Sequence, residues 1–231
     1  MRLHNFFIDQ KIGDSGTITV SDSGLLNQWR HVLRFNTGSS VVLFDNSGFE
    51  YTAQFIELTY LKAEFTIIEK RKNKFLPKRE VFLFQALIKP DKFEWILEKG
   101  TELGVSHFTP VITQRTIPKK FNTERAKKII KESSEQSGRG VLPTISETIS
   151  LEDVISSAPL NPVAFDPSGL PIHDSLFLIR DSISVLIGPE GGFSDQELKL
   201  FSEKNIPILS LSSQILRAET ASVSVSSLLL L

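Results

Sequence analysis

The sequence predicts an α/β protein in which a small β-barrel precedes a mostly parallel sheet with helices on both faces. Short strand-like segments separated by turn signals dominate roughly the first 75 residues. Strand-like and helical segments then alternate to the end of the chain. Residues 70–80 (KRKNKFLPKRE), between the two regions, are charged and contain Pro77, as is typical of a linker. We therefore predict a barrel domain over residues 1–72 and an α/β domain over residues 73–231.

The first region has the signals of a small antiparallel barrel. SVVLFD (40–45) and FEYTAQFIEL (49–58) are rich in the β-branched and aromatic residues of strands. Asn46-Ser47-Gly48, between them, is a hairpin-turn signal. LKAEFTIIE (61–69) follows with partial alternation, and one helical interval at about 23–34 interrupts the strands.

The second region alternates between buried-strand runs and helical spacing. Strands are predicted over residues 82–88, 107–113, 162–166, 183–187 and 206–211. Helices are predicted over about 91–103, 123–136, 195–204 and 218–230. This alternation favours parallel strands joined by helical crossovers, which cover both faces of the sheet.

Capping residues indicate where two of these helices begin and one ends. Asp91 with Glu94, and Ser194 with Glu197, have the three-residue spacing of a capping box. Gly104 follows the last helical position of the first of these helices, where a left-handed residue commonly ends a helix.

Composition excludes several kinds of site. The chain has 231 residues and no cysteine, which rules out a disulfide framework, a thiolate metal site and a cysteine nucleophile. The four histidines are scattered without metal-binding spacing, so we predict no metal site. No segment approaches the roughly 18 apolar residues that span a bilayer, and the N-terminus lacks the apolar core of a signal peptide. We therefore expect a cytoplasmic protein with no membrane association.

Charge is distributed unevenly along a chain whose net charge is only −1. From Thr113 to Arg139 there are eight basic and three acidic residues, whereas residues 140–179 contain no lysine or arginine. Such a basic stretch can form a phosphate-contacting surface. It can equally be the solvated face of an ordinary helix, and from charge alone the second interpretation is favoured.

A glycine-rich loop, Gly188-Pro189-Glu190-Gly191-Gly192, lies between a buried strand and a capped helix. Ligands of α/β sheets bind beyond the carboxyl ends of strands, and glycines let the backbone approach them closely. The loop matches neither the phosphate-binding P-loop nor the dinucleotide fingerprint. Read alone, it is also compatible with a tight strand-to-helix turn.

A second segment, Ile215-Leu216-Arg217-Ala218-Glu219-Thr220, joins a strand to the last helix. Arg217 and Glu219 place two opposite charges at the start of that helix. They could form a local ion pair of little energetic value, or they could face an anionic substrate and orient it.

Taken together, these elements resemble one family, the RsmE family of 16S rRNA uridine-N3 methyltransferases within the SPOUT superfamily. The resemblance follows the family order over essentially the whole chain. Its elements are Met1–His4, His31–Arg34, Leu87–Lys89, Lys99–Val105, Arg115-Thr116, Glu135–Arg139, Ile187–Ser194 and Ile215–Ala221. The chain departs from the family pattern at Ser212 and Gln214, where a glycine and an arginine are usual.

The resemblance implies a PUA-like barrel followed by a SPOUT domain with a C-terminal trefoil knot, assembled as a homodimer. It also implies S-adenosyl-L-methionine as cofactor, held in the knot mainly by backbone groups. The expected cofactor-binding residues are Phe165, Asp166, Leu186, Ile187, Gly188, Glu190, Gly191, Gly192, Leu211, Ser212, Ile215 and Leu216. The small and apolar residues of the last helix suit dimer packing, namely Ala221, Val223, Val225 and Leu228.

The implied reaction methylates N3 of a uridine in 16S ribosomal RNA, within the small subunit. We expect Arg217 to stabilise the developing uridine anion, and Glu190 and Glu219 to orient groups or relay the proton. The expected RNA contacts are Arg2, Arg30, His31, Arg34, Arg115 and Arg139.

Two rival functions are open to test. An RNA-binding module of the same fold without catalytic activity predicts degraded GPEGG and ILRAET elements, yet both are intact. A small-molecule enzyme that uses the glycine-rich loop as an anion cradle leaves the barrel and the basic helix without a role.

Overall fold

The computed structural model describes residues 3–117, 120–157, 160–172 and 181–231, and it divides into two compact units. The N-terminal unit comprises Met1–Leu76 and a short segment, Ser134–Leu142, which we call the return segment. The C-terminal unit comprises Pro77–Ser133 and Pro143–Leu231. A division of the chain at residue 72 alone does not include the return segment in the first unit.

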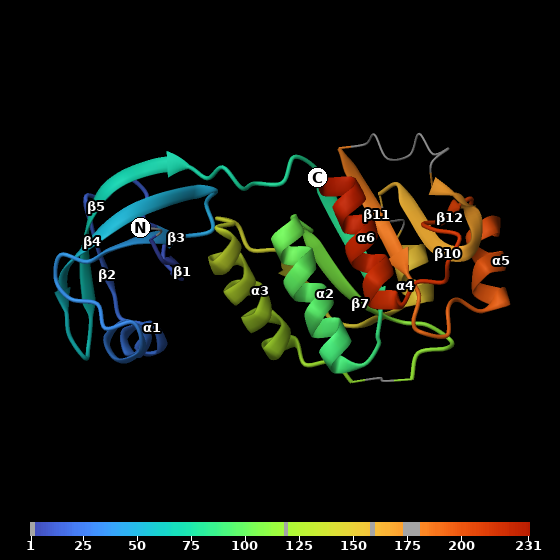
Figure 1. The fold of residues 1–231 in the computed structure, drawn as a ribbon, viewed down its shortest axis with the longest axis horizontal. Helices are drawn as coiled ribbons and strands as arrows, with labels where there is room; N and C mark the ends of the chain where they lie inside the picture. The colour runs from blue at the N-terminus through green and yellow to red at the C-terminus, as the bar shows by residue number, and fades with distance from the viewer. Residues whose placement is uncertain (1–2, 118–119, 158–159, 173–180) are drawn as a thin grey trace. The chain divides into compact units, whose positions relative to one another are not determined.

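The N-terminal unit is built on a five-stranded sheet with the order β1-β3-β4-β5-β2 (Figure 1). β1 and β3 run parallel, and the other neighbouring strands are antiparallel. The predicted hairpin is confirmed, whereas the two short outer strands carried no clear sequence signal. The strands are β1 (Asn5–Phe7), β2 (Thr17–Val20), β3 (Ser40–Phe44), β4 (Phe49–Leu58) and β5 (Ala63–Lys72).

Trp29 is the centre of the core of this unit. The predicted helical interval forms α1 (Ser23–Asn27) followed by a π-helical turn, η1 (Gln28–Val32), which carries Trp29. The indole is fully buried. Its ring meets three phenylalanine rings edge-on at 5.4–5.5 Å, an arrangement that adds to the free energy of burial: Phe6, Phe55 and Phe65.

Hydrogen bonds from Phe7 and Asn73 hold the return segment in the N-terminal unit. The Glu135 carboxylate accepts a hydrogen bond from the Phe7 backbone N–H at 2.9 Å. The Asn73 amide donates to the Gly138 carbonyl at 2.9 Å and accepts from the Gly140 N–H at 3.2 Å. A Cβ on Gly140 would lie only 2.9 Å from the Asn73 side chain, so this position requires glycine. Gly140, the last residue of SEQSGRG, therefore has a structural reason.

The C-terminal unit contains a seven-stranded sheet in which every neighbouring pair is parallel. The strand order is β12-β10-β11-β6-β7-β8, and β9 also pairs with β7. The predicted strands are confirmed, but the linker is shorter than predicted because β5 extends to Lys72. The strands are β6 (Glu80–Ala86), β7 (His107–Ile112), β8 (Thr144–Ile145), β9 (Ile149–Ser150), β10 (Pro162–Pro171), β11 (Ser182–Ile187) and β12 (Ile208–Ser210).

Helices cover both faces of this sheet, as the alternating pattern predicts. On one face, Phe84 of β6 packs in a cluster with Val154 and Phe201. On the other, the next residue along β6, Gln85, accepts a hydrogen bond from the Ser222 hydroxyl. The helices are α2 (Pro90–Leu103), α3 (Thr123–Ser137), α4 (Leu151–Ser156), α5 (Asp195–Glu203) and α6 (Ala218–Leu230).

One predicted capping box is present and the other is not. Ser194 and Glu197 cap α5 reciprocally. The prediction that Asp91 caps α2 is wrong, because the helix already begins at Pro90, whose fixed φ suits the first helical position. Gly104 ends α2 with φ 114°, as predicted. No helix in the described residues is long and apolar enough to cross a membrane.

Replacing Trp29 with alanine should destabilise the N-terminal unit by about 3–5 kcal/mol, the usual cost of emptying a large aromatic site. Chemical denaturation followed by circular dichroism measures this loss. Val32→Ala is the matched control, because Val32 lies on the same turn but is 69% exposed. An equal effect of both substitutions would contradict this account of the core.

Candidate active site

Three adjacent parallel strands of the C-terminal unit bring chain segments together at their carboxyl ends. β11 leads into the glycine-rich loop (188–194), and β12 leads into the segment before α6 (211–217). β10, which lies between β11 and β12, changes register against β12 between Phe165 and Leu170. Ligand sites of parallel sheets form at this edge.

A cavity of about 500 Å³ lies among these segments. The family resemblance implies twelve cofactor-binding residues, and all but Leu186 line this cavity. Leu186 is buried and packs against the α4 and α5 side of the sheet, because side chains alternate along β11. The lining residues that the sequence predicts are Phe165, Asp166, Ile187, Gly188, Glu190, Gly191, Gly192, Leu211, Ser212, Ile215 and Leu216.

One wall of the cavity is an excursion of β10 at Asp166-Pro167-Ser168-Gly169. The Asp166 carboxylate accepts hydrogen bonds from the Ser168 N–H at 3.0 Å and from its hydroxyl at 2.7 Å. A Cβ on Gly169 would lie 2.6 Å from backbone atoms of Leu209 on β12, so only glycine fits there. Of this wall, only Asp166 is among the residues expected from the sequence, and Pro167 and Ser168 are not. Asp-Pro-Ser-Gly is nevertheless a strong turn signal.

Two charged side chains hold the glycine-rich loop: Arg115, which also lines the cavity, and Glu197. The Arg115 guanidinium donates to the carbonyls of Gly191 and Phe193, each at 2.9 Å. The Glu197 carboxylate accepts from the Ser194 N–H at 2.7 Å and from the Gln114 N–H at 2.8 Å. The structure thus places Arg115, an expected RNA contact, where it positions the loop.

The charges that line the cavity favour a cationic ligand. Three carboxylates line it, those of Asp166, Glu190 and Asp195, against the single cation of Arg115. That guanidinium already donates to loop carbonyls. The opposite balance of charge would favour an anion. The geometry therefore disfavours the rival interpretation of the loop as a phosphate site.

The three expected catalytic residues divide between this cavity and a second concavity, which we call the outer hollow. The outer hollow is lined by Asp91, Lys92, Trp95, Ile215, Leu216, Arg217, Glu219 and Thr220. Ile215 and Leu216 also line the cavity, so the two spaces adjoin. Glu190 is in the cavity, where its carboxylate lies 3.5 Å from the Lys89 N–H at the start of α2.

Arg217 and Glu219 differ in their surroundings within the outer hollow. The Glu219 side chain is 11% exposed and its carboxylate lies 3.2 Å from the Lys92 ammonium. Arg217 precedes α6, is exposed, and makes no ion pair with any residue that the structure describes. The Arg217–Glu219 ion pair that sequence reasoning considered is not formed, and Arg217 is available to a ligand.

Arg139, another expected RNA contact, is buried in the N-terminal unit. Its side chain is only 4% exposed. Burial disfavours the charged guanidinium and lowers the pKa of Arg139 to about 10. In this arrangement the side chain does not reach a surface where RNA could contact it.

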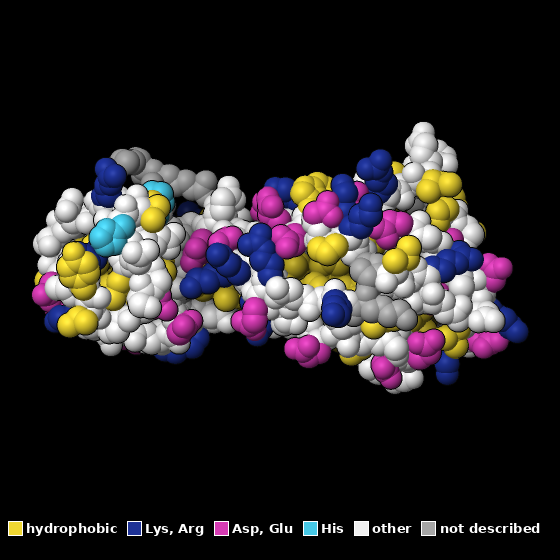
Figure 2. Space-filling model, turned by 90° about the horizontal axis from the view of Figure 1, so that it is seen from below, with side chains coloured by type: hydrophobic (Ala, Val, Ile, Leu, Met, Phe, Trp, Pro, Cys, Tyr) yellow, Lys and Arg dark blue, Asp and Glu magenta, His cyan; other side chains and the backbone are white. Residues whose placement is uncertain are grey.

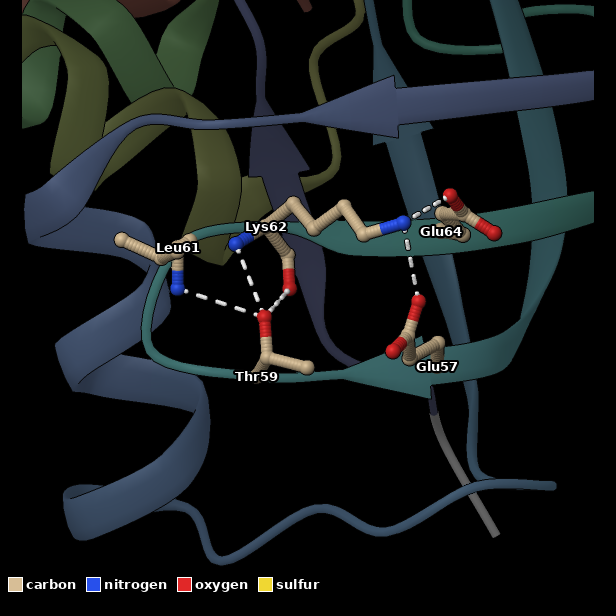
Figure 3. Close-up of polar contacts among 5 residues, drawn as sticks. All are labelled: Glu57, Thr59, Leu61, Lys62 and Glu64. Carbon is tan, nitrogen blue, oxygen red and sulfur yellow. Dashed lines mark hydrogen bonds and ion pairs between the residues drawn. The ribbon is translucent and has the colours of Figure 1, made fainter.

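Arg30, His31 and Arg34 lie at or just after η1, whereas Arg2 lies outside the described residues. The Arg30 guanidinium stacks over the Tyr60 ring at 3.2 Å. Tyr60 is 75% exposed at the turn between β4 and β5. Figure 3 shows how the Thr59 hydroxyl holds this turn, accepting from the Lys62 N–H at 3.1 Å and donating to its carbonyl at 3.0 Å.

The basic helix α3 has the features of an ordinary solvated helix face. Three of its basic side chains have carboxylate partners within 4 Å. Figure 2 shows basic and acidic side chains interspersed on the face of the protein that is in view. Such exposed pairs contribute little to stability but reduce the local positive charge. The pairs are Arg125–Glu94, Lys127–Glu124 and Lys128–Glu132.

Comparison with known proteins gives a consistent result. A family model described as an RNA methyltransferase domain matches residues 76–230. A ribosomal RNA small subunit methyltransferase E from Aquifex aeolicus is 34% identical over 171 residues, covering 71% of this chain and 73% of the relative. The protein of that name from Rickettsia conorii is 29% identical, covering 96% of this chain and 93% of the relative.

A solved structure shares the fold over nearly the full length. It is a putative methyltransferase from Legionella pneumophila in complex with the bound cofactor SAM, 26% identical with a TM-score of 0.90. The match covers 99% of this chain and 97% of that one. The predicted α/β fold with a parallel sheet is therefore confirmed.

Replacing Gly169 with alanine should force β10 away from β12 and lower the melting temperature of the C-terminal unit by several degrees, the effect of roughly 1–3 kcal/mol of overpacking. Differential scanning calorimetry measures the shift. Gly16→Ala is the matched control, because a Cβ there meets no atom within 4 Å. Tolerance of alanine at Gly169 would show that the two strands are not held this closely.

Proposed function

The chain belongs to the RNA methyltransferase family, and from that premise we propose that it methylates N3 of a uridine in small-subunit ribosomal RNA, with S-adenosyl-L-methionine as methyl donor. The observation that carries the proposal is the cavity at the ends of β10, β11 and β12. Two of its walls, the glycine-rich loop and the residues before α6, contain the GPEGG and ILRAET elements on which the resemblance depends. Both elements are intact in this chain, and the departures at Ser212 and Gln214 lie just before the second one.

The cavity suits the cofactor in size and in chemistry. A volume of about 500 Å³ is within the usual range for small-molecule sites. Phe165, Leu211 and Leu216 offer apolar contact to an adenine ring, and the glycine-rich loop offers backbone N–H and C=O groups. The carboxylates of Asp166 and Glu190 favour the positive charge of the cofactor. When bound, the cofactor supplies a methyl group activated for transfer.

The outer hollow supplies the groups that act on the uridine. Loss of the N3 proton leaves negative charge on the base, and Arg217 is the exposed cation that can hold it. The ion pair with Lys92 already engages Glu219, so we assign Glu219 to orienting that lysine. Glu190, in the adjoining cavity, is then the carboxylate that accepts the proton or passes it to water.

Finer features of the architecture belong to the same proposal. We propose that the N-terminal unit is a PUA-like barrel, that the C-terminal unit contains the trefoil knot, and that two copies form the working dimer. Leu228, which is 59% exposed on α6, supports a partner on that helix together with Val223, whereas Ala221 lines the cavity. Val225 is fully buried inside its own chain and does not contribute to that surface.

The N-terminal unit offers a second RNA contact surface. Arg30, His31 and Arg34 combine with the exposed ring of Tyr60 in the arrangement that single-stranded RNA favours, cations beside an aromatic face. We propose that this surface contacts the substrate, ribosomal RNA in the cytoplasm.

Mass mapping of 16S ribosomal RNA from a strain that lacks this protein tests the function. One uridine methylation should disappear and should return with the wild-type chain. Arg217→Ala should fail to restore it, because losing a preorganised cation costs roughly 100-fold or more in rate, while calorimetry should show unchanged cofactor affinity.

Arg125→Ala, an exposed arginine on α3 of the same unit, is the matched control and should restore the methylation. An unchanged methylation pattern in the deletion strain would refute the function. Restoration by Arg217→Ala would refute only the role of that residue.

A further inference from the structure

The chain has two tryptophans in opposite environments. Trp29 is fully buried in the N-terminal unit, whereas Trp95 is 40% exposed on α2 of the C-terminal unit. Trp95 lines the outer hollow. An indole left partly open inside a polar concavity retains a π-face that can contact a ligand.

The outer hollow brings Trp95 to the chemistry of the proposed reaction. α2 supplies Trp95 and Lys92, and α6, which packs against α2, begins directly after Arg217 (Figure 1). The shared residues Ile215 and Leu216 separate the outer hollow from the cavity. A group that enters the outer hollow therefore lies beside a ligand in the cavity.

We propose that Trp95 is the stacking platform for the target base, which enters the outer hollow unstacked from its neighbours. The inference rests on the proposed function and adds the residue that holds the base. An enzyme that modifies a base edge acts on a base that is single-stranded or is extruded from a helix, and an unstacked base exposes both of its faces. An aromatic side chain replaces the lost stacking without restricting base identity.

The other residues that line the outer hollow supply hydrogen-bond donors for the edge of the base, which stacking does not contact. Arg217 offers donors to a uracil carbonyl oxygen, and the pairing of Lys92 with Glu219 keeps a second cation in place. Uracil presents two carbonyl oxygens that flank N3, and such an edge matches donors rather than acceptors. Trp95 thus holds the face of the base while Arg217 reads its edge.

A second copy of this chain is the competing occupant of the outer hollow. A dimer partner that covered Trp95 would also bury its exposed face. The charged side chains favour the base as occupant, because four of them line the outer hollow, those of Asp91, Lys92, Arg217 and Glu219, whereas the cores of subunit interfaces are depleted of charge.

Intrinsic fluorescence of the full-length protein separates these occupants. Acrylamide should quench Trp95 selectively, because Trp29 is buried, and a single-stranded oligouridine RNA should both quench Trp95 and protect it from acrylamide. Trp95→Phe should abolish the RNA-dependent signal. If the protection of Trp95 from acrylamide increases with protein concentration and not with RNA concentration, a second copy is the occupant and the proposal is overturned.

Steady-state methylation supplies the second measurement. Trp95→Ala should lower kcat/KM for RNA by roughly 5- to 150-fold, leave the cofactor Kd within twofold, and be largely rescued by Trp95→Phe. Glu98→Ala, exposed on the same helix, should have no effect. An unchanged kcat/KM in Trp95→Ala would overturn the proposal. Because the fluorescence titration needs no turnover, RNA-dependent quenching without methylation would support the base site and reject the reaction.

Discussion

The close approach of β10 to β12 at Gly169 is the constraint on which the candidate site depends. Because the glycine has no Cβ, the backbone of one strand can lie against that of the next. The chain then resumes its pairing with Leu209 after the Asp-Pro-Ser-Gly excursion. The excursion becomes a wall of the cavity, and the loops after β11 and β12 become the remaining walls. A regular strand in place of β10 would leave no wall on this side.

The glycine-rich loop is fixed by side chains that bond to its backbone. Arg115 and Glu197 fix the glycine-rich loop through its carbonyls and N–H groups, which leaves other backbone groups free to face a ligand. The Ser222 hydroxyl of α6 donates a hydrogen bond to Gln85 of the sheet, and Arg217 and Glu219 lie at the start of the same helix. The charges at this end of the outer hollow therefore belong to a helix that a buried neutral group joins to the sheet.

Sequence alone predicts the elements whose signals are local. The apolar runs of β6 and β11 and the capping box of Ser194 depend on neighbouring residues only, and the structure has them. Features that depend on contacts between residues far apart in the chain cannot be predicted from the sequence alone. The two-residue strand β8 exists only because β7 offers an edge, and the burial of Arg139 follows from how the return segment packs. The family motifs indicate which segments surround the cavity. Which side chains line it depends on the alternation of side chains along β11, which places Ile187 in the cavity and Leu186 in the core on the other face of the sheet.

We expect the cavity to hold S-adenosyl-L-methionine mainly through backbone groups. A crystal structure of the protein grown with the cofactor tests this expectation. The cofactor should lie between residues 188–192 and 211–216, with most of its polar atoms bonded to backbone N–H and C=O groups. A cofactor bound elsewhere on the chain, or held in the cavity chiefly by side chains, would show that backbone groups are not the basis of binding.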